Sequence, residues 1–180
     1  MNMDPETGVS IMKIVPELDA GPVLIQSKIK ITKETNHKEL SEQMSELGAK
    51  LILDTFEIIK NKKVNFIEQN ESEATYAKKI EKIETRINWK DDAGKILAKI
   101  NAFCPNPGCW FELDGIRMKI IKAKEIIING APGTILDEKL TIACFRNAIQ
   151  IIELQKEGKQ KMTTNEFLRG NKIKIGQSLN

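Results

Sequence analysis

A polar stretch near the middle of the chain, residues 64–86, limits what the parts on either side of it can fold into. Its apolar residues follow neither the helical nor the strand spacing, and residues 68–73 are all polar, which is typical of a linker. The charge also changes sign close to it: residues 1–75 contain 9 basic and 13 acidic side chains, whereas residues 76–180 contain 19 and 12. We therefore predict two structural parts, residues 1–63 and 87–180, joined by a linker over residues 64–86.

The first part is predicted to contain two strands and a long helix. Apolar residues are concentrated in 8–14 and again in 23–31, as expected for two strands. Asn36, with Glu39 three residues later, resembles a capping box, and the apolar residues that follow recur at intervals of three, four and seven. This spacing predicts one helix, ending near Lys63, whose apolar face consists of Leu40, Met44, Leu47, Leu51 and Ile58.

The second part is predicted to be rich in short strands. A helix over 91–103 comes first, because Pro105 and Pro107 cannot continue it. The dipeptide Asp114-Gly115 between two apolar runs predicts a hairpin of strands 109–113 and 116–123. Strands are also expected at 134–136, 140–145, 148–154 and 173–175, and a short helix at 163–168. This succession indicates a small closed or partly open β-barrel of the OB type, so that the fold class of the chain is α+β.

Composition indicates a cytoplasmic protein without a membrane partner. No run of 18 apolar residues is present, and the first residues lack the basic-then-apolar pattern of a signal peptide. The three cysteines, Cys104, Cys109 and Cys144, do not form a Cys-x-x-Cys pair, and we expect them to be reduced and buried. Because the chain contains only one histidine, His37, no metal site is expected.

A carboxylate lies in the turn between the first two predicted strands. Asp19 is followed two residues later by Gly21, which allows the backbone to approach another segment closely. Two interpretations of Asp19 are open at this point: its side chain caps the turn by hydrogen-bonding its own backbone, or it is the carboxylate of a functional site.

Several segments, in order, resemble one known family. Residues 18–22, Leu-Asp-Ala-Gly-Pro, resemble the Leu-Asp-x-Gly motif of folate-dependent formyltransferases. Residues 74–80 and 87–89 resemble the linker and the domain entry of methionyl-tRNA formyltransferases within that group. Residues 106–108, 153–155 with 158–159, and 167–170 resemble the C-terminal domain of these enzymes.

This resemblance implies a fold and an activity. Residues 1–63 would be an incomplete α/β, Rossmann-like segment of the formyltransferase catalytic domain, and residues 87–180 an OB-like, tRNA-binding β-barrel. The family transfers a formyl group from 10-formyltetrahydrofolate, its co-substrate, to the amino group of methionyl initiator tRNA in translation initiation. Asp19 would be the catalytic carboxylate that orients a histidine and assists proton movement.

Two features depart from the family pattern. Its Asn-x-His motif and its Ser-Leu-Leu-Pro loop are found nowhere in these 180 residues, and His37 lies at the start of the predicted long helix. Residues 145–147 replace a glycine-rich turn. We therefore expect a truncated member that is catalytically incomplete alone and needs an N-terminal formyltransferase fragment as partner. The alternative is a non-catalytic tRNA- or RNA-binding module or a pseudogene remnant.

Basic residues are the candidates for contact with tRNA. The net positive charge of the second part suggests a polyanionic partner such as RNA. Alternatively, the charged residues that alternate with apolar ones form a solvent-exposed strand face without a partner. Trp89 and Trp110 are either base-stacking platforms or core anchors. The candidates for nucleic-acid binding are Lys78, Lys79, Lys82, Arg86, Lys119 and Lys122.

Overall fold

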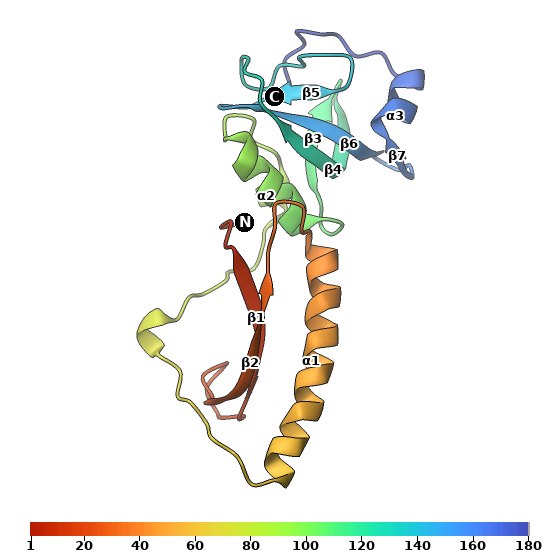
Figure 1. Ribbon diagram of the computed structural model, residues 1–180. Coiled ribbons are helices and arrows are strands. Elements are labelled where there is room, and N and C mark those ends of the chain that lie inside the picture. Colours follow the sequence, from red (N-terminus) through yellow and green to blue (C-terminus); the bar gives the residue numbers. More distant parts are fainter. Residues whose placement is uncertain (180) are drawn as a thin grey trace. The chain divides into compact units, whose positions relative to one another are not determined.

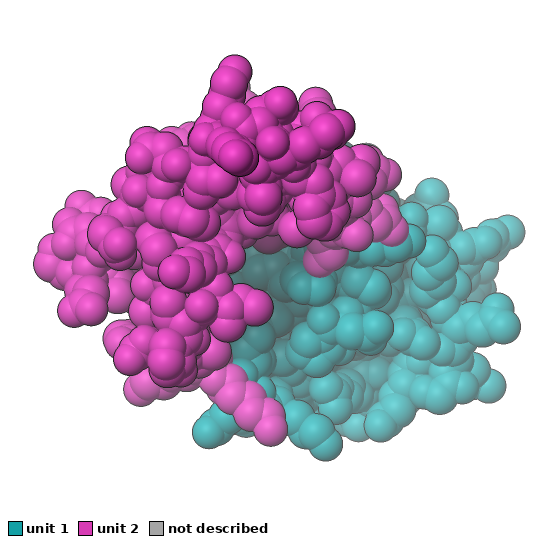
Figure 2. All heavy atoms as spheres, turned by 90° about the horizontal axis from the view of Figure 1, so that it is seen from below, with its two compact units in different colours: residues 1–3, 33–38, 80–180 teal, residues 4–32, 39–79 magenta. Residues whose placement is uncertain are grey.

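A computed structural model describes residues 1–179, which divide into two compact units. Of the described residues, unit 1 comprises 1–3, 33–38 and 80–179, and unit 2 comprises 4–32 and 39–79; Figure 2 colours the two separately. Helices and strands occur in both, which confirms the predicted mixture of α and β structure. No helix within residues 1–179 is both long and apolar enough to cross a membrane.

Unit 2 contains a β-hairpin and most of the long helix (Figure 1). Strand β1 (Glu6–Met12) pairs antiparallel with β2 (Val23–Lys30), and helix α1 spans His37–Lys60. These three elements lie where the sequence predicts them. The polar stretch after α1 is partly ordered by pairing, because the backbone of Ile67 exchanges two hydrogen bonds with that of Val23. Two short 3-10 helices follow, η1 (Glu71–Glu73) and η2 (Lys82–Thr85).

The predicted apolar face of α1 is its most protected face. Leu51 is buried and the other four predicted residues are half-buried, but Thr55 is buried on the same helix and its hydroxyl has no hydrogen-bond partner among the described residues. A second apolar stripe of α1 is exposed to solvent. It consists of Ile52, Leu53, Phe56 and Ile59.

Unit 1 is built on a curled antiparallel sheet (Figure 1). Its strands are β3 (Cys109–Leu113), β4 (Ile116–Ile126), β5 (Thr141–Ala143), β6 (Ala148–Lys156) and β7 (Lys161–Thr163). The order is β3-β4-β6-β5, with β7 pairing β6. The predicted hairpin is confirmed, since Asp114 and Gly115 both have positive φ, as a tight hairpin turn requires, although β4 extends beyond the predicted end to Ile126.

Two predicted strands in this unit are wrong, and one observed strand was not predicted. The predicted strand at 173–175 is wrong: Ile175 and the left-handed Gly176 form a turn, and the backbone of Ile135 bonds those of Gly176 and Gln177. The predicted strand at 134–136 is also wrong, because Thr134 and Ile135 form only isolated bridges, to Ser178 and Ile142. Strand β7 was not predicted, because three residues are too few to show alternation.

The core of unit 1 lies between the sheet and two helices. Helix α2 (Ala93–Phe103) contributes Ile96, Ile100 and Phe103, and helix α3 (Thr164–Gly170) contributes Phe167. Trp89 is buried in this core, where its ring meets that of Phe111 edge to face with the centroids 5.7 Å apart. The reading of Trp89 as a core anchor is therefore confirmed.

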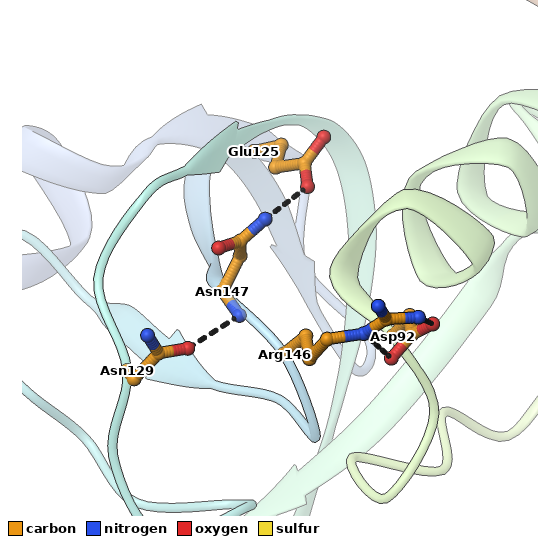
Figure 3. A network of polar contacts seen from close by, with 5 residues as sticks. All are labelled: Asp92, Glu125, Asn129, Arg146 and Asn147. Carbon is orange, nitrogen blue, oxygen red and sulfur yellow. Dashed lines mark hydrogen bonds and ion pairs between the residues drawn. The ribbon is translucent and has the colours of Figure 1, made fainter.

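The turn between β5 and β6 is tied to the start of α2 (Figure 3). The guanidinium of Arg146 forms two hydrogen bonds with the carboxylate of Asp92, at 2.7 and 3.2 Å, and this interaction holds the pKa of Asp92 below its usual value. Asn147 has a φ of 62° and donates to the carboxylate of Glu125. Asparagine is one of the residues that tolerate this left-handed conformation, which explains how the turn forms without glycine.

Candidate functional site

Asp19 lies in an exposed turn of unit 2 between β1 and β2. Its backbone is left-handed, with a φ of 55°. Residue 21 must be glycine because a Cβ atom there would overlap the carbonyl oxygen of Lys13, whose N–H in turn bonds the carbonyl of Pro22. The close approach expected for Gly21 is thus confirmed.

The backbone of this turn is held by a residue far along the chain. The side-chain amide of Gln69 donates to the carbonyl oxygens of Asp19, at 2.8 Å, and Gly21, at 2.7 Å. Gln69 follows the bridge between Val23 and Ile67, which places it beside the turn. The sequence offered no signal for this contact, because residues 68–73 read only as a polar linker.

Asp19 is exposed to solvent. Among residues 1–179 no group hydrogen-bonds its carboxylate, so the reading of Asp19 as a side chain that caps its own turn does not describe the structure. His37, the first residue of α1, is exposed and belongs to the other unit. The turn therefore presents an unpaired acceptor on a backbone that is fixed by hydrogen bonds.

The basic candidates lie on different elements. Lys78 and Lys79 are exposed in the extended segment at the end of unit 2, and Lys82 is the exposed first residue of η2. Lys119 and Lys122 lie on β4; the side chain of Lys119 passes over Gly108 and donates weakly, at 3.4 Å, to Asn106. Arg86 and Lys119 are brought close to the same residue, Trp110, which pairs with both of their backbones.

Two guanidinium groups lie over the ring of Trp110. The carbon atom Cζ of Arg117 is 4.3 Å from the ring centroid, and that of Arg86 is 5.4 Å from it, both within the range of a cation–π interaction. The indole N–H donates to the hydroxyl of Thr85 at 3.1 Å, which fixes the orientation of the ring. We call Arg86, Trp110 and Arg117 the Trp110 stack. The sequence showed these residue types, but only the strand register brings them together.

Two further charges adjoin the Trp110 stack. The carboxylate of Glu112 lies 3.5 Å from the guanidinium of Arg86, and the ammonium of Lys99 donates to the carbonyl oxygen of Arg86 at 3.0 Å. Trp110 itself is only half-buried, so its reading as a core anchor is wrong. The stack forms a positively charged, partly aromatic surface, a combination found in nucleic-acid-binding proteins.

The thiols do not contribute to a reactive site. All three cysteines are buried and free, as expected. Burial raises the pKa of Cys109 to about 12 and that of Cys144 to about 12, so that neither forms a thiolate near neutral pH.

Two family models match the chain. "Formyl transferase, C-terminal domain" matches residues 79–172, and "Formyl transferase" matches residues 1–56. Because the first match alone covers more than half of the chain, the chain belongs to the formyl transferase family. The resemblance inferred from the sequence motifs is confirmed.

Within this family, curated relatives carry the name methionyl-tRNA formyltransferase. The protein of that name from Bradyrhizobium diazoefficiens is 40% identical over 177 residues, which cover 96% of this chain and 57% of the relative. The one from Pelagibacter ubique is 41% identical over 180 residues, which cover 99% of this chain and 58% of the relative. The chain thus spans less than two thirds of the length of these relatives.

A solved structure has a similar fold. HypX from Aquifex aeolicus, in complex with tetrahydrofolic acid, superimposes with a TM-score of 0.69 at 21% identity, covering 97% of this chain and 34% of that chain. At this level of identity the comparison supports the arrangement of helices and strands.

Proposed function

We propose that this chain acts in the transfer of a formyl group from 10-formyltetrahydrofolate to the amino group of methionyl initiator tRNA, in the cytoplasm. The observation that carries the proposal is the 40% identity with a curated methionyl-tRNA formyltransferase over 96% of the chain. In this proposal residues 1–63 belong to a Rossmann-like catalytic domain, residues 64–86 are the linker, and residues 87–180 form an OB-like tRNA-binding domain.

Asp19 is the proposed catalytic carboxylate. During transfer, the amine nitrogen attacks the formyl carbon, the carbon–nitrogen bond to the folate breaks, one proton leaves the attacking nitrogen, and the departing folate nitrogen takes up one proton. The oxyanion formed on the way needs hydrogen-bond donors, and the proton needs a base. An acceptor such as Asp19, unpaired and held on a fixed turn, suits the orientation of an imidazole. The imidazole and the oxyanion donors would come from the part of the relatives that this chain does not span.

The tRNA is the proposed macromolecular substrate, bound by basic side chains through its phosphates. Support comes from the excess of basic over acidic residues in 76–180 and from the position of the proposed basic side chains, which are exposed or, for Arg86 and Lys119, half-buried. The proposed contacts are Lys78, Lys79, Lys82, Arg86, Lys119 and Lys122.

Formylation of methionyl initiator tRNA by the chain, with and without the complementary N-terminal segment of the Pelagibacter ubique relative, tests this proposal. We expect turnover only with the added segment, and its loss in Asp19→Asn. Glu17→Gln is the matched control, because Glu17 is an exposed acid in the same turn. Turnover by the chain alone would show that it is catalytically complete, whereas equal activity of both variants would remove Asp19 from the site. Binding of tRNA without turnover under any condition would leave a non-catalytic RNA-binding module.

A further inference from the structure

Arg117 has unused hydrogen-bonding capacity in a fixed position. Arg117 is exposed, and the Cζ atom of its guanidinium lies 4.3 Å from the centroid of the Trp110 ring. No carboxylate among the described residues pairs with this guanidinium. A guanidinium has five N–H donors in its plane. A cation–π interaction restricts the side chain but does not by itself satisfy these donors, which stay available to another partner.

The register of the hairpin produces this arrangement. Trp110 lies opposite Lys119 and Glu112 lies opposite Arg117, so that Arg117 is the diagonal neighbour of Trp110 on the same face. On the other edge of β3, the backbone of Arg86 bridges to Trp110, and the N–H of Ile87 bonds its carbonyl oxygen. The indole thus receives one guanidinium from each neighbouring segment.

Glu112 opposes the positive charge of the stack. Its carboxylate lies 3.5 Å from the guanidinium of Arg86, at a distance too long for a strong ion pair, and both side chains are about half exposed. An incoming anion would compete with Glu112 for Arg86. Removal of this one negative charge should therefore favour anion binding.

The neighbouring charges indicate a polymeric anion. Lys119, Lys122 and Lys124 follow Arg117 along β4, so that positive charge continues along this strand. A row of charges suits the regularly spaced phosphates of a nucleic-acid backbone better than one small anion.

We propose that the Trp110 stack is a phosphate clamp for the RNA backbone, in which Arg117 is the principal donor and Glu112 lowers the affinity. This inference rests on the proposed function, since tRNA is its ligand. It adds Arg117 to the basic residues proposed to contact tRNA, names Glu112 as a residue that opposes binding, and assigns the indole of Trp110 the role of positioning the two guanidinium groups.

Binding of the full chain to a bacterial initiator tRNA transcript, measured over a series of salt concentrations, tests the clamp. For Arg117→Gln we expect binding on the order of tenfold weaker and a salt slope lower by about 1. Arg117→Lys keeps the charge but not the planar fork, and we expect binding about threefold weaker. Glu112→Gln should bind about threefold tighter with a steeper slope, a change that misfolding cannot produce.

Matched controls come from the turn before β5, the strand at the far end of the sheet order from β3. Lys139→Gln and Glu138→Gln change the charge by the same amounts at exposed positions, and we expect both to bind as the unmodified chain does. If Arg117→Lys binds as well as the unmodified chain, or if Glu112→Gln and Arg117→Gln match their controls, the clamp is overturned while tRNA binding stands. Failure of the unmodified chain to bind tRNA would overturn both the clamp and the proposed tRNA substrate.

Discussion

Replacement of Phe111 by alanine is expected to remove a large part of the stability of unit 1. Phe111 is 1% exposed, and its ring meets that of Trp89 edge to face. Truncation of a buried phenylalanine to alanine costs about 3–5 kcal/mol, because packing is lost and a cavity remains. The aromatic pair contributes about 0.5–1.5 kcal/mol beyond its buried area. Since domains of this size are stable by about 5–15 kcal/mol, the loss amounts to about a fifth of the total or more.

Urea unfolding followed by tryptophan fluorescence measures this loss selectively. Both tryptophans, Trp89 and Trp110, belong to unit 1, so that the signal reports on that unit alone. Phe145→Ala is the matched control, because Phe145 is 66% exposed and its truncation should change the free energy of unfolding by less than about 0.5 kcal/mol. A similar loss for both variants would refute the assignment of Phe111 to a tightly packed core.

Three further predictions concern the Asp19 turn, the thiols and acid stability. Gly21→Ala should open the turn around Asp19, because the added Cβ atom overlaps backbone, and hydrogen exchange of the amides in residues 13–22 should accelerate. Cys109 and Cys144, whose pKa values are raised by burial to about 12, should not react with a thiol reagent at pH 8 until the protein is unfolded. Partial burial alone would raise the pKa of Asp137, but hydrogen bonds, first of all from Thr141, lower it overall. Asp137 therefore stabilises the fold fully above its unfolded pKa of about 3.9, and this contribution is lost as the pH falls through the lower folded value.

A control variant or a contradicting outcome is available for each of these three predictions. Gly170→Ala adds a Cβ atom with no atom within 4 Å and should leave exchange unchanged. Rapid labelling of Cys109 in the folded protein would contradict its burial. Asp137→Asn should be less stable than the unmodified chain at neutral pH, and the difference should shrink below about pH 4; a difference that is independent of pH would contradict the assigned hydrogen bonds.

Local sequence determined where the long helix, the Asp114-Gly115 hairpin turn and the turn that carries Asp19 form. The spacing of apolar residues in α1, the Asp114-Gly115 turn and the glycine two residues after Asp19 depend on contacts between near neighbours, and each is found where it was expected. Short or bridged segments were predicted poorly, because a pairing of one to three residues is set by its partner and leaves no periodic pattern.

The surroundings of both candidate sites were decided only by the tertiary structure. Gln69 reaches the carbonyl of Asp19 across 50 residues, since one backbone bridge, between Val23 and Ile67, brings the polar segment alongside. Arg117 lies over Trp110 because the hairpin register makes them diagonal neighbours, and Arg86 arrives from a separate segment. The sequence by itself specifies which side chains are available and which local turns form; pairing between distant segments determines which of those side chains meet.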